Sequence, residues 1–97
     1  MKNCDLSVFD IMECEKLASL YVNSDWCRNA DLYRDGEGNL IVFWQWLEAH
    51  GVGQDHYSCI VESVRDLQKI LYKDVERGLL SQKKADKVIG NCEKFFA

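Results

Sequence analysis

The segment from residue 35 to residue 39 reads Asp-Gly-Glu-Gly-Asn, and this tight-turn sequence constrains the fold more than any other part of the chain. Glycine and asparagine tolerate the positive φ angles that such turns require. The flanking residues 30–34 and 40–46 are rich in large apolar, aromatic or β-branched side chains. The pattern predicts a β-hairpin. The alternative is that Asn39 caps a short buried helix over residues 40–49.

Apolar residues recur at helical spacing between residues 11 and 22, before the hairpin. Ser7 and Asp10 have the spacing of a capping box, in which each side chain bonds the backbone N–H of the other residue. The polar residues 23–25 would end the element. This region therefore predicts an N-terminal helix.

A second apolar stripe covers residues 57–75, which is enough for about five helical turns. Gly78 suits the end of such a helix, and Ser81 is a good N-cap for a last helix. A turn this short predicts that the two helices pack antiparallel. The expected fold class is α+β, with an N-terminal helix, a β-hairpin and a C-terminal antiparallel helical hairpin in one compact domain over residues 1–97.

The chain has 97 residues, which suits a single domain. Its longest apolar run, residues 40–44, is far shorter than the ~20 residues that a membrane span needs. The N-terminus lacks the apolar core of a signal peptide. We therefore expect a cytoplasmic protein with reduced cysteines, of which Cys14, Cys59 and Cys92 belong to the core.

The sequence predicts no catalytic residue, no metal site and no cofactor. Structural zinc sites need closely spaced ligand pairs, whereas no two of the five cysteines are closer than ten residues. Cys59 with His56 is the best candidate for a nucleophile and its base, but Cys59 falls on an apolar stripe, where a thiol is inert. Asp35 and Glu37 are solvated turn residues rather than paired catalytic acids. We therefore expect a binding protein and not an enzyme.

Charge is divided unevenly along the chain. Residues 1–56 carry ten acidic and four basic side chains, a net charge of −6, whereas residues 57–97 carry six acidic and eight basic side chains, a net charge of +2. A negative field attracts basic partners and repels nucleic acid. The expected partner is a protein with a basic, nucleic-acid-binding surface, and the sequence predicts neither direct nucleic-acid binding nor a membrane. The predicted partner-binding residues lie on or beside the hairpin: Asp25, Asp31, Asp35, Glu37 and Glu48.

Two further patterns have a structural interpretation. Basic residues recur at every fourth position from residue 65 to residue 77, but acidic residues alternate with them, which is typical of a solvated helix face. Trp44 and Trp46 share one face if their segment is a strand, with Phe43 and Gln45 on the other. We expect all three tryptophans, Trp26, Trp44 and Trp46, in or beside the core, with a partner surface as the alternative.

In size and charge the whole chain resembles phage-encoded anti-CRISPR proteins, in particular small inhibitors of the type I-F surveillance complex. Some members of that group mimic DNA by presenting carboxylates where phosphates would lie. The resemblance implies an inhibitor that occupies a lysine-lined DNA channel and blocks target DNA binding. It carries no motif, so no residue role is transferred.

Two other classes of function remain open. An immunity or antitoxin protein that caps a toxic nuclease would present the same acidic surface to a different partner. A helical adaptor or structural phage protein would instead use its apolar and aromatic surface. The sequence leaves the partner and the oligomeric state open.

Overall fold

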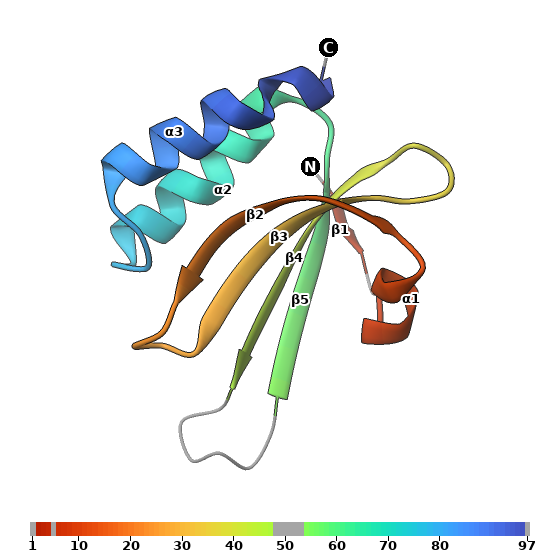
Figure 1. Ribbon diagram of the computed structural model, residues 1–97, viewed down its shortest axis with the longest axis horizontal. Coiled ribbons are helices and arrows are strands. Elements are labelled where there is room, and N and C mark those ends of the chain that lie inside the picture. The colour runs from red at the N-terminus through yellow and green to blue at the C-terminus, as the bar shows by residue number, and fades with distance from the viewer. Residues whose placement is uncertain (1, 5, 48–53, 97) are drawn as a thin grey trace.

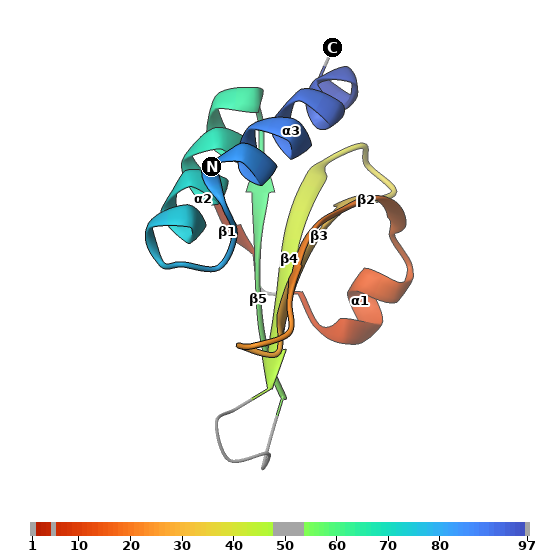
Figure 2. The same cartoon turned by 60° about the vertical axis from the view of Figure 1, so that its left-hand side comes forward.

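The computed structural model describes residues 2–4, 6–47 and 54–96, and within them the protein is built on a five-stranded antiparallel sheet (Figure 1). The strands are β1 (Lys2–Cys4), β2 (Glu15–Asn23), β3 (Arg28–Arg34), β4 (Leu40–Leu47) and β5 (Gln54–Val61), in the order β1-β5-β4-β3-β2. One face of the sheet carries α2 (Val64–Glu76) and α3 (Gln82–Cys92), followed by the short 3-10 helix η1 (Glu93–Phe96). The short helix α1 (Val8–Met12) lies on the opposite side (Figure 2).

The expected arrangement of helix, hairpin and helical hairpin is wrong, and the largest error is at the N-terminus. The Ser7–Asp10 capping box is present, but α1 ends after one turn and β2 follows. The register of β2 on β3 shifts between Lys16 and Ala18 and again between Ser19 and Tyr21. Each such irregularity disturbs the strict alternation of a strand. The apolar residues of β2 therefore fall at spacings that imitate a helix.

The predicted hairpin is confirmed, because β3 and β4 pair antiparallel along their length. Asp35 holds its turn: the carboxylate accepts hydrogen bonds from the backbone N–H of Glu37 (2.9 Å) and of Asn39 (2.8 Å). Gly38 has a φ of +88°, a backbone conformation that favours glycine. The alternative of a helix that begins at Asn39 is wrong.

Residues 57–75 do not form one helix. Their first part belongs to β5, and α2 begins only after Ser63, whose hydroxyl accepts a hydrogen bond from the backbone N–H of Asp66. Apolar groups cover both faces of the sheet here: Cys59 and Val61 face α2 and α3, whereas Ile60 faces α1. A strand covered on both faces has a continuous apolar sequence, so periodicity does not distinguish it from a helix.

The C-terminal pair of antiparallel helices is present, although its first helix is shorter than predicted. The hydroxyl of Ser81 caps α3 by accepting a hydrogen bond from the backbone N–H of Lys84 (3.1 Å). Gly78, with a φ of +79°, lies in the turn between α2 and α3, which run back along each other across the sheet (Figure 1). Their inner sides and the sheet enclose the main core, which includes the fully buried Leu67, Leu71 and Ala85. A smaller core joins Ile11 of α1 to Ile41 and Phe43 of β4.

Candidate functional site: a cleft between the sheet and α2

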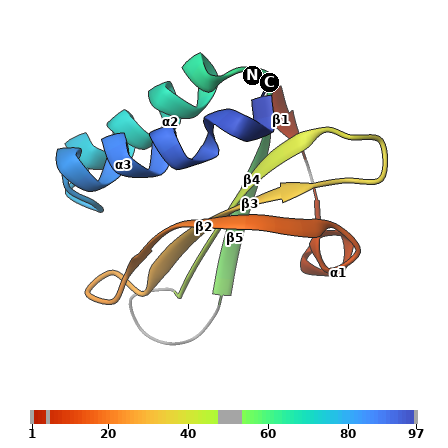
Figure 3. The same cartoon turned by 45° about the horizontal axis from the view of Figure 1, so that its top comes forward.

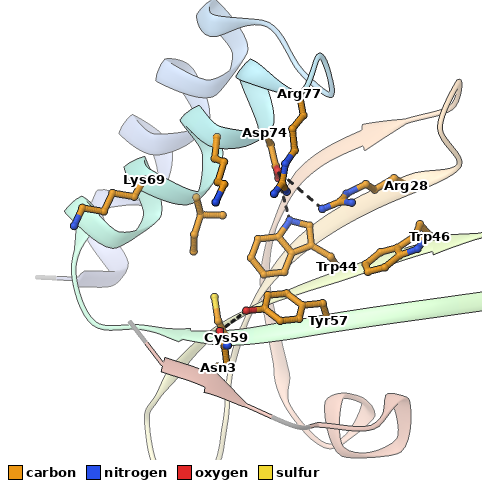
Figure 4. A pocket seen from close by; sticks show the side chains of 11 residues that line it. Asn3, Arg28, Trp44, Trp46, Tyr57, Cys59, Lys69, Asp74 and Arg77 are labelled. Carbon is orange, nitrogen blue, oxygen red and sulfur yellow. Dashed lines mark hydrogen bonds and ion pairs between the residues drawn. The ribbon is translucent and has the colours of Figure 1, made fainter.

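A cleft of about 600 Å³ lies between the sheet and α2 (Figure 4). Its walls come from four strands and one helix. The strands contribute Asn3 of β1, Arg28 of β3, Trp44 and Trp46 of β4, and Tyr57 and Cys59 of β5. The helix α2 contributes Lys69, Ile70, Lys73 and Asp74, and its C-cap residue is Arg77. Trp44 and Trp46 point to the same side of the sheet because side chains two residues apart in a strand share a face. The predicted sharing of a face by these two tryptophans is confirmed, whereas the expectation that Trp26 lies in or beside the core is wrong, because it is 64% exposed.

Asp74 is the fixed centre of the cleft. Its side chain is buried, and its Oδ2 accepts hydrogen bonds from the Tyr21 hydroxyl (2.8 Å) and from the indole N–H of Trp44 (3.0 Å). Burial raises the pKa of Tyr21, and the hydrogen bond to Asp74 raises it further, so the phenol remains a neutral donor. A buried carboxylate with these donors holds the helix in one position relative to the sheet.

Two arginines approach the other oxygen of this carboxylate (Figure 4). A terminal guanidinium nitrogen of Arg77 lies 3.4 Å from Asp74 Oδ1, and one of Arg28 lies 3.9 Å away. Arg28 also donates from Nε to the Tyr21 hydroxyl (3.2 Å). The side chain of Arg28 is 20% exposed and that of Arg77 is 52% exposed, so both guanidinium groups remain accessible from the cleft.

Aromatic rings form the sheet side of the cleft. The rings of Trp44 and Tyr57 lie 5.3 Å apart at an interplanar angle of 37°. The guanidinium of Arg28 lies over the Trp46 ring, 4.9 Å from its centroid, within the range of a cation–π contact. The Tyr57 hydroxyl donates to the side chain of Asn3, which ties the end of this wall to β1. The result is a largely apolar surface beside fixed cationic groups.

The cleft is positive although the whole chain is negative. Among the residues that the structure describes, Arg28, Lys69, Lys73 and Arg77 line it together with one carboxylate, that of Asp74, so these lining residues carry a net charge of +3. The net charge of the chain is −4. The tertiary structure therefore collects positive charge at one concave place.

The thiol in the cleft wall is not an activated nucleophile. Burial raises the pKa of Cys59 to about 12, so the thiol stays protonated at neutral pH. The predicted base, His56, stacks on Phe43 instead, with ring centroids 5.6 Å apart. Phe43 belongs to the small core on the α1 side of the sheet. The two residues therefore lie on opposite faces of β5 and do not form a catalytic pair.

Cysteine burial follows the sequence analysis in part. Cys59 and Cys92 are buried, as predicted, whereas Cys14 is partly exposed because its segment is not a long helix.

In the ranges 2–4, 6–47 and 54–96, no three His, Cys, Asp or Glu side chains are grouped so that they could hold a metal ion. Across the same ranges, no helix is both long and apolar enough to cross a bilayer.

The structure does not bring the predicted partner-binding acids together. Asp25 lies in the exposed turn before β3, whereas Asp35 and Glu37 lie in the turn after it, so that the whole strand separates them. Asp31 is buried, and its carboxylate already has partners within the protein. It forms an ion pair with Lys16 (3.6 Å) and accepts a hydrogen bond from the side-chain amide of Asn29 (3.0 Å). Glu48 lies outside the described residues.

Sequence reasoning identified part of the cleft but gave it another meaning. The basic residues at every fourth position include Lys69, Lys73 and Arg77, and the acids between them indicated a self-neutralised face. Asp74, one of those acids, is instead buried against the sheet. Arg28 belongs to the acidic half of the chain, and nothing in its local sequence connects it with α2.

No known protein-family model matches this sequence, and comparison with curated proteins and with solved structures finds no similar protein. The site is therefore interpreted from its own geometry and charge.

Proposed function

We propose that this protein is a binding protein whose cleft holds a small planar anion, an aromatic ring that carries a phosphate or a carboxylate. One observation carries the proposal: a net charge of +3 lines a concave site beside tryptophan and tyrosine rings. Unbalanced positive charge in a partly enclosed place favours an anionic ligand, because a low local dielectric strengthens Coulomb attraction.

The arginines are arranged for an oxyanion. Arg28 and Arg77 are oriented by the same buried carboxylate, and one carboxylate neutralises only one of them. Guanidinium groups present several N–H donors in a plane and can bind a carboxylate or phosphate through two parallel hydrogen bonds. Fixing them in advance lowers the entropy that binding would cost.

The aromatic side of the cleft explains why the ligand should be planar. Offset stacking on an aromatic ring contributes roughly 0.5–1.5 kcal/mol beyond the burial of its area. The cleft volume of about 600 Å³ lies within the range of roughly 300–1,000 Å³ that is usual for small-molecule sites. The proposed activity is binding, and the protonated thiol in the cleft wall is not used as a nucleophile.

The direct test is a titration with adenosine 5′-monophosphate, with salicylate as a second planar anion. The quenching of tryptophan fluorescence and the heat of binding would be measured at low salt. Adenosine, which lacks the charge, and inorganic phosphate, which lacks the ring, should each bind at least about tenfold more weakly, because a charge-assisted hydrogen bond contributes roughly 1.5–3 kcal/mol. The absence of saturable binding by either planar anion would overturn the proposal.

A matched pair of variants separates the cleft from general positive charge. Lys69→Ala with Lys73→Ala removes two cations that line the cleft, whereas Lys83→Ala with Lys87→Ala removes two exposed cations of α3. The first pair should weaken binding at least about tenfold. The second pair should leave the affinity nearly unchanged. Equal losses in both pairs would mean that the anion binds nonspecifically.

A further inference from the structure

The helix α1 exposes its large apolar side chains. Phe9 is 80% exposed and Met12 is 74% exposed, and Val8 is also open to solvent. Met12 lies three positions after Phe9 and four after Val8, so its side chain lies next to each of theirs on the helix surface. The inward position is taken by Ile11, which packs on Ile41 and Phe43. Folding therefore does not need Phe9 or Met12, and it leaves both in water.

Four carboxylates lie on α1, at its C-cap or in the turn at the same end of the sheet. Asp10 and Glu13 belong to α1 and its end, and the β3–β4 turn with Asp35 and Glu37 lies at the same end of the sheet (Figures 1 and 3). The strand register supports this placement, because Glu15, just after α1, is opposite Arg34, just before the turn.

The electrostatic environment of Cys14 also places three of these carboxylates, those of Asp10, Glu13 and Asp35, near one another. Burial raises the pKa of Cys14, and the nearby charges of Asp35, Glu13 and Asp10 raise it further. The pKa of Asp10 is itself lowered, chiefly by the hydrogen bond from the backbone N–H of Ser7, so its carboxylate is charged at neutral pH. Two bases of the neighbouring strands are already paired: Lys16 with Asp31 and Arg34 with Glu15.

We propose that α1 and the β3–β4 turn form a docking surface for another protein, whose contact site is a basic surface around an apolar pocket. Phe9 and Met12 are the apolar anchors, and Asp10, Glu13, Asp35 and Glu37 form the acidic rim. Large side chains in a partner's pocket carry most of the energy of an interface. The rim steers the encounter and selects the partner by its charge.

Charge decides against other occupants. An anionic membrane and a nucleic acid are both repelled by four carboxylates, and a second copy of the same surface would bring like charges together. A basic protein surface is the class of partner that the charge of residues 1–56 predicts. The contact residues differ from the predicted set, which shares only Asp35 and Glu37 with them. Asp31 is buried and paired, Asp25 lies in the turn at the other end of β3, and Glu48 lies outside the described residues.

The test uses a defined probe, an amphipathic helical peptide of lysine and leucine. Two comparison peptides complete the set: one of glutamate and leucine, which reverses the charge, and one of lysine and serine, which lacks the apolar side. The full-length protein, labelled with ¹⁵N, is titrated with each peptide and its amide shifts are recorded. The lysine–leucine peptide should shift the amides of residues 8–15 and 35–38, and the other two should bind much more weakly.

Variants establish which groups carry the binding. Phe9→Ser with Met12→Ser should weaken it about 30-fold or more, whereas Val22→Ser with Trp26→Ser, which removes exposed apolar groups of β2 and the following turn, should leave it unchanged. Glu13→Lys with Glu37→Lys should weaken it about tenfold. The matched control reverses Glu76 and Glu93, which are exposed in the C-terminal half. Amide spectra of each variant verify that the fold is intact.

Each other result overturns the proposal. Shifts confined to other elements would place the interface elsewhere, and equal binding of the lysine–serine peptide would show that charge alone acts. A concentration-dependent dimer in sedimentation that is lost with Phe9→Ser and Met12→Ser would mean that the surface binds a second copy. No binding of the lysine–leucine peptide up to millimolar concentration would also contradict it.

Discussion

The cleft and the α1 surface lie on opposite faces of one sheet and have opposite character. In the cleft, cationic side chains surround aromatic rings, and a buried carboxylate fixes two of the cations. On the α1 surface, Phe9 and Met12 are exposed, and the nearby charges are the carboxylates of α1, its C-cap and the β3–β4 turn. The strand β4 contributes to both regions, because Trp44 faces the cleft and Phe43 faces α1. The alternation of a strand thus lets neighbouring residues of β4 support two surfaces of different chemistry.

The comparison also shows how folding redistributes charge. Along the sequence, residues 1–56 are acidic and residues 57–97 are basic. In the folded protein, Arg28 lines the positive cleft although it belongs to the acidic half of the sequence. Asp74 belongs to the basic half of the sequence but is buried at the base of the cleft. Positive and negative side chains are therefore grouped at different places on the folded molecule, and these groups match the two halves of the sequence only in part.

The largest effect is expected at the centre of the cleft. Asp74→Ala would leave the Tyr21 hydroxyl and the Trp44 N–H without their acceptor and Arg28 without its carboxylate. Breaking a buried charged network in this way costs roughly 3–5 kcal/mol of unfolding free energy. Urea denaturation followed by fluorescence would measure the loss.

Asp74→Asn is the companion variant, because it keeps one acceptor oxygen and removes the charge. It should cost less than Asp74→Ala while still disordering the two arginines. If both variants lose under about 1 kcal/mol, the network does not hold α2 on the sheet.

A smaller effect on the free energy of unfolding should distinguish a core residue from a residue of the docking surface. Leu67, on the core side of α2, is 0% exposed, and Leu67→Ala should cost roughly 2–5 kcal/mol because it leaves a cavity. Phe9→Ala should cost no more than about 0.5 kcal/mol, because that side chain is already in water. Chemical denaturation of both variants gives the comparison. A loss at Phe9 similar to that at Leu67 would make Phe9 a structural residue and remove the anchor of the α1 surface.

The smallest expected effect is on the stability of the protein at low pH. Since the hydrogen bonds from Ser7 lower the pKa of Asp10 below its ordinary value of 3.8, its contribution to stability is fully present above that pH. The contribution should disappear as the pH falls through the lowered pKa of the folded state. The difference in melting temperature between the wild type and Asp10→Ala should therefore shrink below pH 3.8.

Glu37→Ala, at the tip of the β3–β4 turn, is the control for this measurement and should leave the acid dependence unchanged. A gap between wild type and Asp10→Ala that stays constant down to pH 2 would show that the capping carboxylate does not stabilise α1.

Features formed within a few residues could be predicted from the sequence. The Ser7 and Ser81 caps, the Asp35 turn and the burial of Leu67 are all present. Each depends on neighbours no more than four positions away or on one strong apolar stripe, so the local pattern contains the information. The basic residues on α2 were visible in the same way, but their meaning was not, because nothing local shows that Asp74 points into the sheet.

The sequence by itself therefore determined the turn, the caps, the last helix, the later part of the helix before it and the excess of acid, since each follows from nearby residues or from composition. Only the tertiary structure decided that residues 15–23 and 54–61 are strands, that Arg28 reaches α2 and that Phe9 stays exposed. A strand obtains its backbone hydrogen bonds from residues far away in the chain, as when Lys2 pairs with Ile60. An apolar segment with irregular spacing becomes helix or strand according to whether such a partner is available.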